Sequence, residues 1–192
     1  MQQVAESRIV VGISGASGAI YGLRCLDMLR AAGVETHLVV SRSGELTLRS
    51  ECGLGLRDLE ARCDEIHAVG NVGATIASGS FRTLGMIVAP CSIRTLSEIV
   101  SGVTSTLLTR AADVVLKERR PLVLMVRESP LHLGHLRSMT AAAEMGAIIA
   151  PPMPAFYAEP QSIDDLVNHS VGRALDLFGI DSDITRWRGL GK

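Results

Sequence analysis

Short aliphatic runs alternate with longer amphipathic stretches along the whole chain. Runs rich in β-branched residues predict strands over 8–14, 36–41, 65–69, 84–89, 121–127 and 147–151. Helical spacing predicts helices over 19–32, 45–50, 96–102, 106–119, 133–145 and 163–178. Because strands that alternate with helices are typical of a parallel sheet covered on both faces, we expect an α/β, three-layer fold. Its sheet should be a Rossmann-like (flavodoxin-like), doubly wound parallel sheet in a single domain of residues 1–192, with 1–7 as a flexible N-terminus.

Local signals agree with this pattern of elements. Gly33 follows the first predicted helix and should end it, and Ser162 to Asp165 has the spacing of a capping box that opens the last helix. The segment 151–160 holds four prolines, so it cannot continue a sheet. We expect an extended loop there, either as a wall of a binding site or as a simple connector.

Composition narrows the class of protein. Hydrophobic residues make up 47% of the chain and aromatic residues only 3%, which predicts an aliphatic core. The net charge of −1 offers no basic surface for nucleic acid. Apolar runs are shorter than the roughly 20 residues that cross a bilayer, and residues 1–7 lack a secretory signal, so we expect a cytoplasmic protein without a membrane segment. The four cysteines show no metal-ligand spacing and are interpreted as reduced thiols.

A glycine-rich turn follows the first predicted strand and runs into a helix. Free N–H groups at a helix start favour an anion, so the turn from Gly12 to Gly18 indicates a phosphate site. Its glycines are spaced GxxGxxG rather than GxGxxG, and the second strand ends in VSRS without an acidic residue, which counts against NAD. A mononucleotide such as FMN fits better, with hydroxyls and a cation supplied by Ser14, Ser17, Ser41, Arg42 and Ser43. Alternatively, the glycines only let the helix pack closely on the sheet.

A second polar turn follows the fourth predicted strand. Ser92 and Thr95 lie three residues apart at a helix start, where they could converge on a ligand or simply cap the helix. Two such turns at the carboxyl ends of neighbouring strands define the crevice in which open α/β sheets bind ligands. We therefore expect the two turns to share one site.

Charged residues suggest further candidates. Arg110, Asp113 and Lys117 share one helical face, which is most often a solvated face. Arg127 and Glu128 end the fifth predicted strand, and because burying charges is costly, they indicate a site. The HxxH pair of residues 132 and 135 lacks a third ligand, and no GxSxG elbow is present, so neither metal nor serine-hydrolase chemistry is expected.

Taken together, five segments closely resemble the UbiX-type flavin prenyltransferases. They are GISGASGAIYG, IASGSFRTLGMIVAPCS, TLLTRAADVVLKERRPLVLMVRESPLHLGHL, GAIIAPPMPAFY and RWRG, in order over residues 8–189. The resemblance implies a homododecamer with FMN between subunits and no metal ion. It implies transfer of a dimethylallyl group from dimethylallyl monophosphate to N5 and C6 of reduced FMN, giving prenylated FMN for a UbiD-type decarboxylase.

The resemblance also implies residue roles. FMN contacts are expected from Gly15, Ala16, Ser17, Ser41, Ser92, Ile93, Arg94, Thr95 and Arg127. Dimethylallyl phosphate is expected at Tyr157, Arg173, Lys117 and Arg110, with Trp187 near the prenyl pocket and Glu128, Glu51 and Ser17 in catalysis. We expect Arg173 to lack an acidic neighbour within one turn. Val72 stands where some relatives carry a tryptophan, so the group that stabilises an allylic cation is left open.

Two alternatives stay open from the sequence. A flavin-dependent decarboxylase of cysteinyl peptides would share the fold but typically shows an early catalytic histidine and a PxMNxxM segment, and this chain has neither. A non-catalytic FMN carrier is compatible with the phosphate turns alone. The chain lacks the DDxxD carboxylates of diphosphate users, which fits a metal-independent reaction on a monophosphate.

Overall fold

A single parallel sheet forms the centre of the computed structural model, which describes residues 7–189. The strands are β1 (Arg8–Ile13), β2 (Glu35–Val40), β3 (Glu65–His67), β4 (Met86–Cys91), β5 (Leu122–Val126) and β6 (Ile148–Ile149). Their order is β3-β2-β1-β4-β5-β6, with every neighbouring pair parallel. The predicted doubly wound sheet is confirmed, and each predicted strand is present with small shifts at its ends.

Seven α-helices surround this sheet in the described part of the chain. They are α1 (Ala19–Ala31), α2 (Arg42–Cys52), α3 (Leu56–Leu59), α4 (Ile93–Val100), α5 (Leu107–Lys117), α6 (Leu133–Glu144) and α7 (Ile163–Leu175). Short 3-10 turns occur at η1 (Thr75–Ala77), η2 (Phe156–Ala158) and η3 (Asp176–Phe178). The six predicted helices are present. The sequence pattern missed α3, η1 and η2, because a single turn of helix is too short to show a period, and it predicted η3 as the end of α7.

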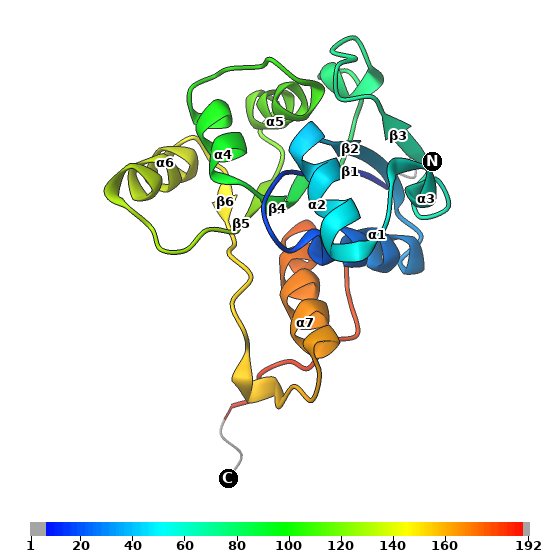
Figure 1. Cartoon of the computed structure of the whole chain (residues 1–192), viewed down its shortest axis with the longest axis vertical. Helices are drawn as coiled ribbons and strands as arrows, with labels where there is room; N and C mark the ends of the chain where they lie inside the picture. Colours follow the sequence, from blue (N-terminus) through cyan, green and yellow to red (C-terminus); the bar gives the residue numbers. More distant parts are fainter. Residues whose placement is uncertain (1–6, 190–192) are drawn as a thin grey trace, which may run out of the picture.

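Two aliphatic cores lie on opposite faces of the sheet. Helices α1 and α7 pack together on one face, and α4 and α5 cover the other (Figure 1). Alternate residues of β1 serve the two cores, with Ile9 and Val11 on the α1 side and Val10 on the α5 side. Burying each such side chain contributes about 1.5–3 kcal/mol. A strand buried on both faces must be apolar throughout, which explains the uninterrupted runs seen in the sequence.

The direction of winding reverses between β1 and β4. These strands are hydrogen-bonded neighbours with Val10 opposite Met86, but the chain leaves β1 toward β2 on one side and returns to β4 on the other. The loops after β1 and β4 therefore leave in opposite directions and open a crevice at the carboxyl ends of the strands. The sequence predicted a site at this edge.

The two helix boundaries marked by local sequence signals, the end of α1 and the start of α7, are also confirmed. Gly33 has φ of 68° directly after α1, and a left-handed residue at this position ends a helix. Ser162 Oγ accepts from Asp165 N at 3.1 Å, and Asp165 Oδ2 accepts from Ser162 N at 2.9 Å, which completes the capping box of α7. The proline-rich segment runs from β6 away from the sheet and toward the C-terminal segment (Figure 1). Within residues 7–189, no helix is both long and apolar enough to cross a bilayer.

Candidate active site

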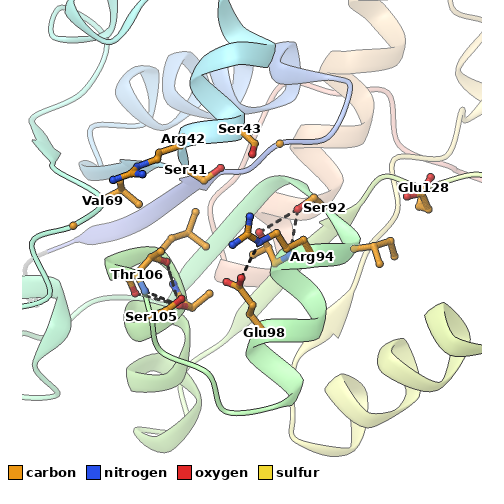
Figure 2. A pocket seen from close by; sticks show the side chains of 16 residues that line it. Ser41, Arg42, Ser43, Val69, Ser92, Arg94, Glu98, Ser105, Thr106 and Glu128 are labelled. Atoms are coloured by element: carbon orange, nitrogen blue, oxygen red, sulfur yellow. Dashed lines mark hydrogen bonds and ion pairs between the residues drawn. The ribbon is translucent and has the colours of Figure 1, made fainter.

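A cavity of about 570 Å³ lies where the predicted crevice was expected. Its walls come from the turns after β1, β2, β3 and β4 and from the start of α5 (Figure 2). Six of the predicted FMN contacts line it: Gly15, Ser41, Ser92, Ile93, Arg94 and Thr95. The predicted sharing of one site by the two polar turns is confirmed.

Glycine at position 15 brings two walls of the cavity together. A Cβ on Gly15 would lie 2.2 Å from the Cβ of Ser43, so no larger residue fits between the β1 turn and the start of α2. A Cβ on Gly22, farther along α1, would lie 2.5 Å from the carbonyl oxygen of Ala89. Gly15 therefore shapes the cavity, and Gly22, which lies beyond the turn, lets α1 pack closely on the sheet.

The amino ends of α2 and α4 both face this cavity. Ser41 caps α2 by accepting from Gly44 N at 3.0 Å, and Ser92 caps α4 by accepting from Thr95 N at 3.3 Å. These caps explain why both helices begin three residues earlier than predicted, at Arg42 and Ile93. Two helix dipoles with their positive ends toward one cavity favour an anionic ligand there.

Ser14 has a structural role rather than a place in the cavity. It is fully buried, its Oγ donates to Pro90 O at 2.9 Å, and the same Oγ accepts from Ser92 N at 2.7 Å. The hydroxyl thereby joins the turn after β1 to the turn after β4. Its predicted contribution to a phosphate site is not supported, because its oxygen is engaged in these two bonds and Ser14 does not line the cavity.

At the amino end of α1, a side chain of the protein occupies the expected anion position. Glu51 Oε2 accepts from Gly18 N at 2.8 Å and from Ala19 N at 3.0 Å. Partial burial raises the pKa of Glu51, but hydrogen bonds from Gly18, Ser17 and Ala19 and the charge of Arg127 outweigh it and lower the pKa below its usual value. The carboxylate thus interacts with both Ser17 and Arg127. Three of the predicted FMN contacts, Ala16, Ser17 and Arg127, do not line the cavity.

Arg127 and Glu128 lie at the carboxyl end of β5, as predicted, but they are not buried there. Arg127 and Glu128 follow the last strand residue, Val126, and both are exposed in the single chain. The expectation that these charges are buried is therefore wrong. Glu128 still lines the cavity, at the end opposite Arg42 in Figure 2, and it accepts from Ser129 N at 3.0 Å.

The predicted basic residues of α5 lie apart from this cavity. Arg110 Nη1 pairs with Asp113 Oδ2 at 2.7 Å, and Lys117 Nζ pairs with Glu118 Oε1 at 2.6 Å. Lys117 lines a different cavity of about 710 Å³, together with Pro121 at the amino end of β5. Within one chain, the structure does not bring Lys117 to the carboxyl edge of the sheet.

Tyr157 and Trp187 meet edge to face, with ring centroids 5.5 Å apart. They line a cavity of about 780 Å³ formed with the C-terminal segment 181–189. The Tyr157 hydroxyl is 2.9 Å from Nε2 of His169, a buried side chain of α7. Sequence reasoning missed His169, because a lone histidine inside a helical pattern carries no motif.

Arg173 has an acidic partner, contrary to expectation. Its Nη1 is 2.5 Å from Asp176 Oδ2, one helical turn away, and Arg186 Nη1 binds the same oxygen at 2.8 Å. Hydrogen bonding and charge from Arg186, then Arg173, lower the pKa of Asp176 despite its partial burial. The i, i+3 spacing of Arg173 and Asp176 was visible in the sequence and was overlooked.

The HxxH pair serves the start of α6. His132 is the cap residue, and its Nδ1 accepts from Gly134 N at 3.0 Å. The rings of His132 and His135 lie against each other with centroids 3.5 Å apart. Helix capping therefore accounts for His132 without a ligand.

Comparison with known proteins identifies a family model and close sequence relatives of this chain. The family model described as "Flavoprotein" matches residues 2–175. The chain is 59% identical to flavin prenyltransferase UbiX of Escherichia coli K12 over 186 residues, which cover 95% of this chain and 98% of that protein. It is 56% identical to flavin prenyltransferase UbiX of Thauera aromatica over 183 residues, covering 95% and 94% of the two chains.

Solved structures agree with the sequence relatives. AnUbiX in complex with FMN and dimethylallyl pyrophosphate matches with a TM-score of 0.94 and 48% identity, covering 97% of this chain and all of that one. A dodecameric FMN-dependent UbiX-like decarboxylase from Escherichia coli O157:H7 matches with a TM-score of 0.92 and 48% identity, covering 95% of this chain and all of the other. The FMN-dependent cysteine decarboxylase TvaF matches at 0.65 with 16% identity, covering 77% and 91%, which shows a shared fold only.

Proposed function

The chain belongs to the family of UbiX flavin prenyltransferases, and from that premise we propose how its own residues serve prenyl transfer to FMN. It is a flavoprotein and a transferase, and the predictions of family, enzyme class and cofactor are confirmed. Residues 1–192 are proposed to form one flavoprotein domain. The specific roles of residues, the acceptor atoms and the prenyl donor are proposals.

The cavity between the two capped helix ends is the proposed FMN site. Its volume of about 570 Å³ lies in the range of small-ligand pockets, and its donors suit a monophosphate. Ser41, Arg42 and Ser43 at the start of α2 would hold the phosphate, while Ser92 to Thr95 at α4 would hold the polar part of the flavin. The end of β2 passes into Ser41, so no carboxylate repels a phosphate at this point. Reduced FMN supplies N5 and C6 as the prenyl acceptors.

The phosphate of FMN is proposed to lie at α2 rather than at α1. Glu51 already satisfies the N–H groups of Gly18 and Ala19, and a second anion beside that carboxylate would be repelled. The observation that carries the assignment is therefore the pair of amino ends of α2 and α4 facing one cavity. The glycine-rich turn contributes shape, through Gly15, and holds Glu51 and Ser17 beside the flavin.

The site for the prenyl phosphate is proposed to form between copies of the chain. Lys117 and Tyr157 line different cavities, and Arg110 and Arg173 line neither of the two. Bulky apolar side chains close to Tyr157 in the sequence are exposed, including Met153 at 70%, Phe156 at 76% and Ile163 at 79%, and Phe156 and Ile163 line one cavity. Exposed apolar groups gathered in this way are typical of an interface. The related dodecamer supports a homododecamer as the state in which these residues converge.

In the assembled site, cations would stabilise the leaving phosphate. Breaking the allylic C–O bond leaves both electrons on the phosphate oxygen, so Lys117, Arg110 and Arg173 would lower the barrier by facing that charge. The Tyr157 hydroxyl would donate to a phosphate oxygen, with His169 holding its ring in place. Trp187 lies against the Tyr157 ring and would form an apolar wall for the prenyl group.

Proton transfer is proposed to fall to Glu128 at the flavin cavity, with Glu51 in a supporting role. Glu128 is exposed at the cavity rim and free to accept a proton during ring closure. Glu51 is held by three hydrogen bonds at the α1 end, so it is expected to stay ionised and to orient Ser17. Glu128→Gln should slow turnover by about 10²–10⁴-fold with FMN binding retained. Equal turnover of the variant and the parent protein in a stopped-flow assay would remove Glu128 from this role.

Monophosphate is proposed as the donor, although AnUbiX was crystallised with the pyrophosphate. The recipient of prenylated FMN is proposed to be a UbiD-type decarboxylase in the cytoplasm, as expected for the family. All four cysteines are free thiols in the structure, which is compatible with a reducing compartment.

A non-catalytic FMN carrier is the alternative. Anaerobic incubation with reduced FMN and dimethylallyl monophosphate, followed by mass spectrometry of the released flavin, separates the two. A transferase yields flavin heavier by one five-carbon prenyl unit, and a carrier returns FMN unchanged. A parallel incubation with dimethylallyl diphosphate measures which donor is used.

A further inference from the structure

Two buried histidines and a carboxylate meet at the edge of the sheet, outside the flavin cavity. His37 of β2 and His67 of β3 are 3% and 6% exposed, whereas the Glu65 side chain is 53% exposed. His37 Nδ1 is 2.9 Å from His67 Nε2 and 3.4 Å from Glu65 Oε2. One donor atom from each residue can be chosen so that all three lie within 4.8 Å of one another. None of the three lines the flavin cavity.

These separations are close to those around a tetrahedral metal ion. With metal–donor bonds of about 2.0–2.1 Å, neighbouring donors in a tetrahedral site lie about 3.3 Å apart. The distance of 3.4 Å between His37 Nδ1 and Glu65 Oε2 already matches, and the two ring nitrogens need to separate by only a few tenths of an ångström. The donor set of two imidazoles and one carboxylate is one that Zn²⁺ prefers.

A second carboxylate orients one of the rings. Glu35 Oε1 lies 2.9 Å from His37 Nε2, and its other oxygen, Oε2, accepts from Arg8 Nε at 3.1 Å. A carboxylate on the far nitrogen of a histidine fixes its tautomer and is the usual support of a metal-binding imidazole. With the proton held at Nε2, the lone pair of Nδ1 faces His67 and Glu65.

The rings are held by packing before any ion binds. His37 and His67 are stacked, with centroids 5.2 Å apart and an interplanar angle of 16°. Phe81 meets His37 edge to face at 4.9 Å, and the guanidinium of Arg8 lies over the Phe81 ring at 4.6 Å. Glu65, by contrast, has a side chain that is half exposed, so it offers a route for an ion from solvent.

We propose that His37, His67 and Glu65 bind one Zn²⁺ per chain, with a water molecule as the fourth ligand. On binding, the proton on His67 Nε2 moves to Nδ1, which faces Glu65 Oε1 at 3.4 Å. The ion joins the three-residue edge strand β3 to β2. Because Val69 and Gly70 line the flavin cavity just after His67, the ion also fixes one wall of that cavity, and it takes no part in prenyl transfer.

The competing interpretation is a hydrogen-bonded histidine pair that needs no ion. Zn²⁺ titration of the chelator-treated, full-length protein at neutral pH, with Co²⁺ as a spectroscopic probe, distinguishes the two. We expect one Zn²⁺ per chain and the visible Co²⁺ absorption of a four-coordinate site. Glu65→Gln should weaken the affinity at least tenfold, and Glu35→Gln by about 10–100-fold.

The matched control is His135→Ala, which removes a histidine of the HxxH pair and should leave Zn²⁺ affinity unchanged. Circular dichroism checks that each variant is folded, and both glutamates to be changed are partly exposed, so folding should persist. Failure of the parent protein to bind one Zn²⁺ per chain overturns the proposal. So does equal affinity of Glu65→Gln and the parent protein, or loss of binding in His135→Ala.

Discussion

Glu51 shows how one side chain can change the meaning of a motif. A glycine-rich turn before a helix ordinarily indicates a phosphate site, and the N–H groups of Gly18 and Ala19 have the required orientation. A carboxylate from α2 accepts from both of them. The anion at the end of α1 is therefore part of the protein, and the ligand phosphate is assigned to α2.

The charge of Glu51 should make stability depend on pH. Its pKa in the folded protein lies below the usual 4.5, so its contribution to stability is present above that value and is lost as pH falls through the lowered pKa. We expect the parent protein to be more stable than Glu51→Gln at neutral pH and the difference to shrink below pH 4.5. Urea unfolding of both proteins over this range measures the difference. A difference that stays constant with pH would contradict the assignment.

Arg173 can be separated from flavin binding at the residue scale. It lies on α7, outside the flavin cavity, and forms an ion pair with Asp176. Arg173→Ala should raise KM for dimethylallyl monophosphate at least tenfold, because a cation of the proposed leaving-group site is lost, and should leave the Kd for FMN within twofold. Fluorescence titration of FMN and steady-state kinetics test the two parts. A loss of FMN affinity as large as the rise in KM would contradict the assignment of Arg173 to the prenyl phosphate site.

At the scale of elements, helices α2 and α4 define the site through their amino ends. Ser92 serves both the helix and the proposed ligand, since its Oγ accepts from Thr95 N and its position lines the cavity. Ser92→Ala should lower the free energy of unfolding by about 0.5–2 kcal/mol through loss of the cap. FMN affinity should fall as well.

The control for this prediction is Ser162→Ala, which removes an equivalent cap from α7, away from the flavin cavity. Its stability should fall by a similar amount while FMN affinity stays unchanged. Thermal denaturation and FMN titration of both variants provide the comparison. If Ser162→Ala weakens FMN binding as much as Ser92→Ala does, the proposed contact of Ser92 with the flavin is unsupported.

The elements themselves could be predicted from the sequence with little error. Strands buried on both faces produce uninterrupted aliphatic runs, and the caps at Ser162 and Gly33 mark helix ends locally. The starts of α2 and α4 were placed too late, because the sequence was interpreted by apolar periodicity, which begins only after a helix has made its first polar turn. Ser41 and Ser92 carried the missing signal as capping residues.

The flavin cavity could be predicted from the sequence, because it is formed by turns that follow neighbouring strands. The cavity followed from two turns after adjacent strands, and the sequence placed it correctly. The contact of Glu51 with α1, the His169 bond to Tyr157 and the cluster around His37 join residues that are 12 to 33 positions apart. No local pattern encodes such contacts, because they arise from the packing of whole elements.

At the scale of the molecule, a single chain holds the flavin cavity but disperses the residues expected to bind the prenyl phosphate. Lys117, at the end of α5, shares a cavity with Pro121 before β5, whereas Tyr157 lines a different cavity with the C-terminal segment. The exposed apolar side chains around Tyr157 add an unburied surface that a monomer would leave in water. Neighbouring copies of the chain are therefore needed to bring these residues together.

Subunit complementation tests this requirement most directly. Lys117→Ala and Tyr157→Phe are each expected to lose most prenyl transfer, while co-assembled hybrids should regain activity, because some sites then receive the intact lysine from one copy and the intact tyrosine from another. Formation of prenylated FMN by hybrids, measured by mass spectrometry against unmixed variants of equal concentration, gives the result. Recovery well above the sum of the two variants is predicted, and hybrids as inactive as their parents would show that one chain supplies both residues.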